Sequence, residues 1–168
     1  MRLFCAIDLS DEMKGALTEL QDDLRSFRIR GNYTKRENFH ITLAFIGEYK
    51  DAGLVVETLE KVRFKPFDIS LDGLGSFGSL WWAGLSQSDS LANLARRVRH
   101  VLSDADIPFD RKRFSPHITL IREPNADLIP GTTVPDIGMT VRRFSLFRSD
   151  RGKNGMIYTE LHTVTGDR

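Results

Sequence analysis

One tetrapeptide occurs twice in the chain and constrains its fold more than any other feature. His-Ile-Thr-Leu spans residues 40–43 and again residues 117–120 of the 168-residue sequence, so each half carries one copy. A single His-x-Thr in a strand usually indicates no more than a polar face. Two identical copies, each after a basic segment, predict two similar lobes that contribute equivalent residues to one site.

Each copy of the repeat has the pattern of a β-strand. Side chains of a strand alternate between its faces, so His40 and Thr42 share one face, as do His117 and Thr119. Two lobes that face each other would therefore present two imidazoles and two hydroxyls to a shared cleft. The apolar residues on the other face are expected to pack inward beneath helices, and these are Phe39, Ile41, Leu43, Phe45, Ile118 and Leu120.

This set of side chains suits phosphodiester chemistry. Near neutral pH, one imidazole can accept a proton from water while the other, protonated, donates to a departing oxygen. The hydroxyls of Thr42 and Thr119, with a nearby cation, can hold the non-bridging oxygens of a phosphate. A metal site is the weaker alternative, because no Asp, Glu or Cys stands at ligand spacing from the histidines. We expect neither a metal nor another cofactor.

Apolar spacing predicts an α+β fold. Several predicted strands follow one another too closely for helical crossovers, which favours mixed sheets over a doubly wound fold. Helices are predicted at 13–27, 51–63 and 90–102, and a long loop at 123–138. Strands are predicted at residues 3–9, 39–46, 67–74, 80–85, 114–122, 141–147 and 156–164.

The charge balance limits the kind of ligand. The chain has 24 Lys and Arg against 23 Asp and Glu, which argues against a protein that coats long nucleic acid. Basic residues gather at Arg25–Arg36, Arg111–Arg113 and Arg142–Lys153, which are candidates for guiding an RNA strand. The single cysteine, Cys5, suits a reducing compartment. With no signal-peptide or membrane-span pattern, we expect a soluble, cytoplasmic monomer without a membrane partner.

The sequence resembles a known family over residues 1 to 161. The residues that carry the resemblance are the two His-Ile-Thr-Leu motifs, the opening Arg2-Leu-Phe-Cys-Ala-Ile-Asp-Leu, the run Arg36-Glu-Asn-Phe-His-Ile-Thr-Leu-Ala-Phe-Ile-Gly-Glu, Pro116-His-Ile-Thr-Leu-Ile-Arg, and Ser145-Leu-Phe-Arg-Ser-Asp before Gly155-Met-Ile-Tyr. Together they resemble the two-histidine (2H) phosphoesterases, and within them the LigT/ThpR-type RNA 2′,3′-cyclic phosphodiesterases, formerly described as 2′-5′ RNA ligases.

The resemblance implies a fold and a reaction. The fold is one domain over residues 1–168, a bilobal, pseudo-two-fold α+β arrangement of two antiparallel or mixed sheets with helices outside and a central cleft. The reaction is metal-independent hydrolysis of RNA or nucleotide 2′,3′-cyclic phosphate ends to 2′-phosphates. Two alternatives stay open: ligation of tRNA halves at the same site, which no sequence feature separates from hydrolysis, and a non-catalytic nucleotide-binding module. The complete His and Thr pairs argue against the binding module.

The resemblance also implies roles for residues. His40 is assigned as proton donor and His117 as proton acceptor, although the identical motifs do not themselves distinguish the two roles. Thr42, Thr119 and Arg122 are expected to bind phosphate. Strict alternation puts Arg122 on the face opposite His117, so its role requires a twist or a bulge at the strand end. Two aromatic residues are candidates for contacting a base or RNA, and these are Tyr33, ahead of the first motif, and Trp82. Trp81 and Trp82 are adjacent in a predicted strand, so at least one of them must be buried in the core.

Overall fold

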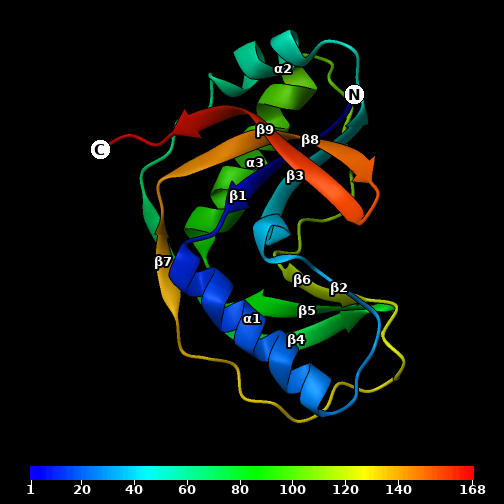
Figure 1. Cartoon of the computed structure of the whole chain (residues 1–168). Coiled ribbons are helices and arrows are strands. Elements are labelled where there is room, and N and C mark those ends of the chain that lie inside the picture. Colours follow the sequence, from blue (N-terminus) through cyan, green and yellow to red (C-terminus); the bar gives the residue numbers. More distant parts are fainter.

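Two antiparallel sheets form the framework of the molecule (Figure 1). The structure is a computed structural model and describes residues 1–168. The strands are β1 (Arg2–Asp8), β2 (Asn32–Tyr33), β3 (His40–Glu48), β4 (Phe67–Phe77), β5 (Leu80–Leu85), β6 (Ile118–Arg122), β7 (Gly138–Val141), β8 (Arg143–Gly152) and β9 (Gly155–Thr165). The helices are α1 (Asp11–Ser26), α2 (Ala52–Leu59) and α3 (Asp89–Asp104), with a 3₁₀ turn at Arg36–Asn38. The first sheet has the order β3-β1-β8-β9 and the second β2-β6-β5-β4-β7.

The two long helices exchange lobes. Helix α1 follows β1 of the first sheet but packs against β6 of the second, and α3 follows β5 of the second sheet but packs against β3 of the first. Figure 1 shows α1 running along the lower sheet and α3 behind the upper one. The Ser10 hydroxyl caps α1 by accepting from the Met13 amide at 3.1 Å. The apolar stripe of α1 is buried, and it consists of Met13, Leu17, Leu20 and Leu24.

Both copies of the repeat contain the same irregularity. The pairing of β3 with β1 skips Leu43, and the pairing of β6 with β5 skips Leu120. An unpaired extra residue in a strand is a β-bulge, and it reverses which face the following side chains occupy. Phe45 and Arg122, each five residues after its histidine, consequently lie on the same face as that histidine.

Each exchanged helix supports one bulge. The amide Nε2 of the buried Gln21, on α1, donates to the carbonyl of Leu120 at 3.0 Å. The guanidinium Nε of Arg99, on α3, donates to the carbonyl of Leu43, also at 3.0 Å. Bulges leave backbone groups outside the sheet ladder, and buried carbonyls need a donor. The duplication therefore extends from the motifs to the way in which their bulges are stabilised.

The predicted α+β class and bilobal arrangement are confirmed, with several differences in detail. All strand pairs are antiparallel, so neither sheet is mixed. Helix α2 ends at Leu59 rather than residue 63, because the next turn tightens to a bond from the Val62 amide to the Leu59 carbonyl. Strand β6 begins only at Ile118, since Pro116 has no amide hydrogen to donate to a ladder.

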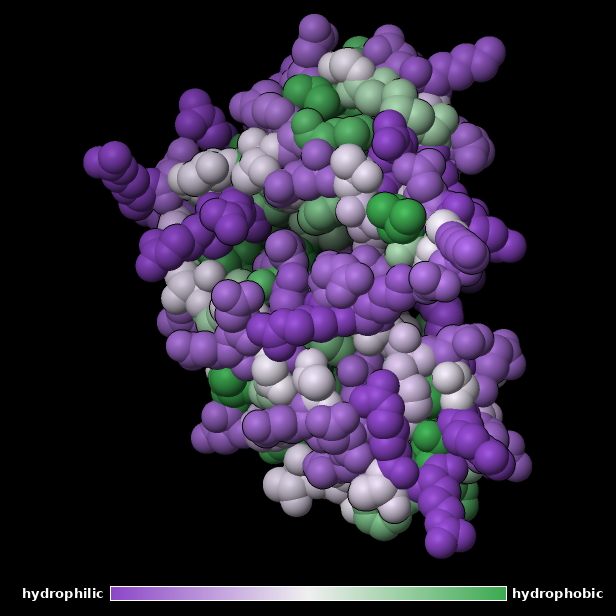
Figure 2. Space-filling model, viewed as in Figure 1, coloured by the Kyte–Doolittle hydropathy of each residue, from purple (hydrophilic) through white to green (hydrophobic).

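The inward packing expected of Phe45 is wrong. The bulge at Leu43 turns the Phe45 ring toward the space between the sheets, and its neighbours Ala44 and Ile46 are buried in the core instead. Hydrophilic side chains cover most of the face seen in Figure 2. None of the helices is long and apolar enough to cross a lipid bilayer.

Candidate active site

A cavity of about 370 Å³ lies between the two sheets and contains both copies of the motif. His40 and Thr42 line it from β3, and His117 and Thr119 line it from the start of β6. No Asp or Glu side chain lines this cavity, whereas three arginines do, and these are Arg2, Arg122 and Arg151. The lining therefore has the charge of a receptor for an anion.

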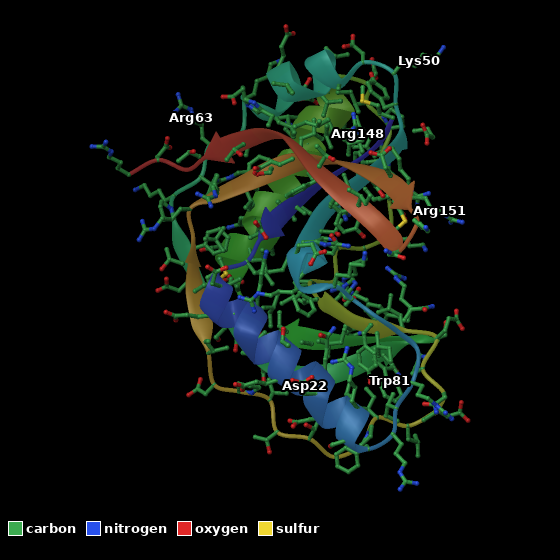
Figure 3. The ribbon with its side chains drawn as sticks, viewed as in Figure 1. Asp22, Lys50, Arg63, Trp81, Arg148 and Arg151 are labelled. Atoms are coloured by element: carbon green, nitrogen blue, oxygen red, sulfur yellow. The ribbon has the colours of Figure 1, made fainter.

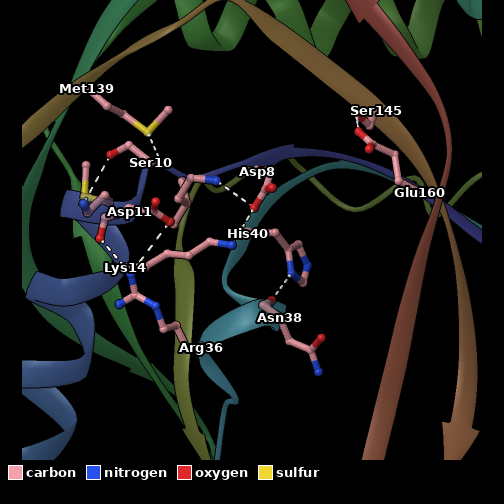
Figure 4. Close-up of polar contacts among 12 residues, drawn as sticks. Asp8, Ser10, Asp11, Lys14, Arg36, Asn38, His40, Met139, Ser145 and Glu160 are labelled. Atoms are coloured by element: carbon pink, nitrogen blue, oxygen red, sulfur yellow. Dashed lines mark hydrogen bonds and ion pairs between the residues drawn. The ribbon is translucent and has the colours of Figure 1, made fainter.

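Both histidines are held in the same way. The Nδ1 atom of His40 lies 2.7 Å from the carbonyl oxygen of Asn38, and Nδ1 of His117 lies 2.7 Å from the carbonyl oxygen of Ser115. Figure 4 shows the first of these contacts. A carbonyl only accepts, so each Nδ1 carries the hydrogen and donates. The Nε2 atom of each neutral ring is then the proton acceptor, which is the tautomer that acid–base catalysis from Nε2 requires.

The hydroxyl of Thr42 lies 2.9 Å from Nε2 of His40. Because Nδ1 carries the hydrogen in the neutral ring, Nε2 accepts here and the hydroxyl donates. His40 and Thr42 are therefore in contact before any ligand binds. A phosphate oxygen entering between them can replace Nε2 as the acceptor of the Thr42 hydroxyl, and it can accept from Nε2 only when His40 is protonated.

Aromatic rings fix the planes of the two imidazoles. The His40 ring centroid lies 5.1 Å from that of Phe4 and 5.4 Å from that of Tyr158, which meets it edge-on. The His117 ring meets Phe77 edge-on at 5.1 Å. Burial raises the pKa of Tyr158, and the guanidinium groups of Arg122 and Arg2 oppose this shift.

Burial also lowers the pKa of His40 below its ordinary value of 6.5. The guanidinium of Arg122 acts in the same direction, as does any charge on the His117 ring, whereas the Asn38 carbonyl and the carboxylate of Asp8 act against it. That carboxylate is itself paired with the ammonium of Lys14 at 3.0 Å (Figure 4). His40 is therefore neutral in the free protein at pH 7.

This shift predicts a pH dependence of stability. Between the folded pKa of His40 and 6.5, the unfolded chain binds more protons than the folded chain, so the free energy of unfolding falls as the pH drops through this window. We expect His40→Gln to remove that part of the slope in urea titrations from about pH 8 to about pH 5. His100→Gln, at an exposed histidine on α3, is the matched control. An unchanged slope in His40→Gln would contradict the prediction.

Arg122 lies where its predicted role needs it. The bulge that this role requires is present at Leu120, and the Arg122 side chain lines the cavity with His117 and Thr119. With Arg122 turned inward by this bulge, all five residues that were assigned to catalysis and phosphate binding line one cavity.

The two predicted base contacts lie outside this lining. The Tyr33 ring lies 4.1 Å from the guanidinium carbon of Arg25, and its hydroxyl donates to the Ile29 carbonyl at 2.7 Å. Trp82 lies beside His117, with ring centroids 6.1 Å apart, and Trp81 is buried in the second sheet, as expected for one of the pair (Figure 3). The base-contact roles of Tyr33 and Trp82 stay predictions.

The cavity also contains residues that the sequence analysis did not select. They are Arg2, Phe4, Thr34, Asn38, Phe45, Ser149, Arg151, Met156 and Tyr158. Arg151 belongs to the basic segment 142–153 and Thr34 to the segment 25–36, whereas none of residues 111–113 reaches the cavity. Arg2 and Phe4 are two residues apart on β1, so strand alternation predicts that their side chains share a face, and both line the cavity.

Comparison with known proteins decides the family. The model of the LigT-like phosphoesterases matches the chain twice, over residues 7–81 and 84–158, so that each match holds one copy of the motif. The chain belongs to this family. Its membership confirms the predicted 2H phosphoesterase assignment and the predicted enzyme class.

Two curated relatives illustrate matches to this phosphoesterase that extend over nearly the whole length of both chains. The RNA 2′,3′-cyclic phosphodiesterase of Thermotoga maritima is 31% identical, over 96% of this chain and 94% of the relative. That of Archaeoglobus fulgidus is 33% identical, over 96% and 98%. The crystal structure of E. coli LigT complexed with 3′-AMP superposes with a TM-score of 0.90 at 25% identity, covering 99% of this chain and 98% of the other.

Proposed function

We propose that this phosphoesterase hydrolyses the 2′,3′-cyclic phosphate at the end of an RNA and leaves a 2′-phosphate. The observation that carries the proposal is the pair of histidines, both in the tautomer with an unprotonated Nε2, in one cavity lined by arginines and no carboxylate. The names of the curated relatives support the same reaction.

The reaction requires one proton to be accepted and one to be donated, and the two histidines share these roles. His117 accepts a proton from water through Nε2 as the water oxygen attacks phosphorus. The bond from phosphorus to the ribose 3′ oxygen breaks, and protonated His40 gives its Nε2 proton to that oxygen. The products are a 2′-phosphate and a 3′ hydroxyl. The hydroxyls of Thr42 and Thr119 and the guanidinium of Arg122 hold the oxygens on which negative charge increases.

The donor role of His40 requires a change of protonation on binding. The free imidazole is neutral near pH 7 because burial lowers its pKa. A phosphate anion beside the ring raises that pKa, since an opposite charge favours the protonated form. We therefore assign the substrate itself a part in charging His40. The product distinguishes the roles, because a 3′-phosphate would mean that the 2′ oxygen leaves and that the assignment must be reversed.

The activity is tested with a nucleoside 2′,3′-cyclic phosphate and with tRNA halves that end in one. We expect both to be opened to 2′-phosphates, resolved from 3′-phosphates by chromatography. Joined halves would reveal the reverse chemistry, ligation. Binding of the nucleotide without turnover would contradict the proposal and indicate a binding module.

Chelation tests the metal-independent mechanism. Three arginines supply the positive charge in the cavity, and no group of three or more His, Cys, Asp or Glu side chains is arranged to hold a metal ion. We expect EDTA to leave the rate of hydrolysis unchanged. Loss of activity on chelation, with recovery on adding a divalent cation, would contradict this mechanism.

We also propose that the enzyme acts as a cytoplasmic monomer. A reducing compartment suits its single thiol, Cys5, which is buried with a pKa raised to about 12. All the residues assigned to the reaction come from one copy of the chain.

A further inference from the structure

Two arginines of the cavity have no part in the reaction described above. Arg2, on β1, and Arg151, on β8, line the cavity together with Arg122. Neither forms an ion pair with a carboxylate, whereas Arg148, on the same strand as Arg151, pairs with Asp150 at 2.8 Å. Two uncompensated guanidinium groups in a cavity favour a second anion.

Arg2 is held over an aromatic ring. Its guanidinium carbon lies 5.0 Å from the ring centroid of Phe45, the residue that the bulge at Leu43 turns into the cavity. Stacking restricts the guanidinium plane and leaves its N–H edges free to bind an anion. Phe45 holds the position in the first lobe that Arg122 holds in the second. At this equivalent position each lobe therefore presents a cation to the cavity. In the second lobe it is Arg122 itself, and in the first lobe it is Arg2, stacked on Phe45.

Arg151 lies beside Arg2 on the same face of the sheet. Arg2 pairs with Ser149 across β1 and β8, and Arg151 is two residues further along β8, near the tip of the hairpin (Figure 3). Diagonal neighbours of this kind have Cα atoms about 7–8 Å apart, within reach of two long side chains. Ser149 also lines the cavity. Two guanidinium groups and a hydroxyl form a suitable cradle for a phosphate.

The cradle is displaced from the catalytic residues. Because Leu43 is bulged, Phe45 and Thr42 pair with Phe4 and Ala6 of β1, two residues apart, which corresponds to about 7 Å of strand. An anion bound by Arg2 and Arg151 is consequently a different group from the phosphate held between the two histidines. In an RNA with a cyclic end, the next phosphate is the one on the 5′ side of the terminal nucleoside.

We propose that Arg2 and Arg151 bind this 5′ phosphate, so that the enzyme distinguishes RNA ends from free nucleoside cyclic phosphates. The inference rests on the proposed function and adds to it the part of the substrate that is recognised. A cyclic mononucleotide without a 5′ phosphate fills only the catalytic half of the cavity. A 5′-phosphorylated nucleotide, or the last two residues of an RNA, fills both halves.

The test compares kcat/KM for adenosine 2′,3′-cyclic phosphate with that for the same compound carrying a 5′ phosphate and for a cyclic-ended diadenylate. The native enzyme should prefer the two substrates with a 5′ phosphate by roughly tenfold or more. Arg2→Gln and Arg151→Gln should each reduce this ratio, and the double variant should bring it near one. Arg2→Lys, which keeps the charge but not the planar stack, should give an intermediate ratio.

Arg148→Gln is the matched control, since it removes an arginine charge from the same strand outside the cavity and should leave the ratio unchanged. Circular dichroism and thermal unfolding verify that each variant folds. A native ratio near one, or a drop by the same factor on all three substrates in Arg2→Gln, would overturn the inference. Absence of turnover by the native enzyme on every substrate would instead overturn the proposed function.

Discussion

Replacing either His40 or His117 with alanine is expected to slow hydrolysis of a 2′,3′-cyclic nucleotide by about a hundredfold or more. Each imidazole is fixed with Nδ1 donating to a backbone carbonyl, so Nε2 is the ring atom available to transfer a proton in the proposed reaction. Alanine removes that atom and leaves the other histidine without a partner for the second transfer. Because the two act in one step, the double variant should lose little more than either single variant. Single-turnover rates measure the chemical step directly.

A third histidine provides the control for this prediction. His100, on α3, is exposed, pairs with Asp104 at 3.1 Å and lies outside the cavity, so His100→Ala should retain the native rate. Near-normal turnover in either His40→Ala or His117→Ala would exclude the two-histidine mechanism. Thermal unfolding of each variant separates a loss of chemistry from a loss of fold.

Strand alternation and the repeat were enough to predict that both histidines and both threonines line one cavity. His40 and Thr42 share a face because the two-residue period of a strand is a local property, and the second copy follows the same rule. What alternation could not predict is the reversal at Leu43 and Leu120. A bulge depends on which residues of the neighbouring strand pair with the motif, and that register is set by tertiary contacts. Phe45 was misplaced for this reason.

The exchange of helices between lobes was equally hidden. The apolar stripe of α1 indicates that one face of this helix is buried, but not which sheet covers it. Gln21 illustrates the difficulty, because a glutamine in an amphipathic helix is ordinarily solvent-exposed. In the structure it is buried and bonds to the carbonyls of Leu120 and Thr34. Its role depends on a strand that follows it by about a hundred residues in the chain.

The near-neutral composition conceals a local separation of charge. Only one net positive charge remains over the whole chain, yet the cavity is lined by three arginines and two histidines and by no acidic side chain. The carboxylates lie elsewhere, and some of them pair with surface cations such as Arg25 and Arg63. Overall charge therefore constrains how much RNA the protein can cover, whereas the cavity decides which part of an RNA it binds.

Replacing Arg122 with alanine is expected to lower kcat by about a hundredfold, the usual effect of removing one donor to a developing negative charge. The bulge at Leu120, the last residue of the second motif, precedes Arg122 on β6, and it turns the Arg122 side chain toward the histidines. Because the charge on the phosphate oxygens is greatest in the transition state, kcat should fall more than KM rises. Arg122→Lys should recover part of the loss, since lysine keeps the charge but not the two-pronged contact.

Arg148→Ala is the control for Arg122, because its guanidinium pairs with Asp150 and does not line the cavity. Arg122 forms no ion pair of its own, so its removal should leave the thermal midpoint of unfolding close to native. A variant with native kcat and a raised KM would show that Arg122 binds substrate and transition state equally. In that case the two threonine hydroxyls and protonated His40 would have to stabilise the developing charge without it.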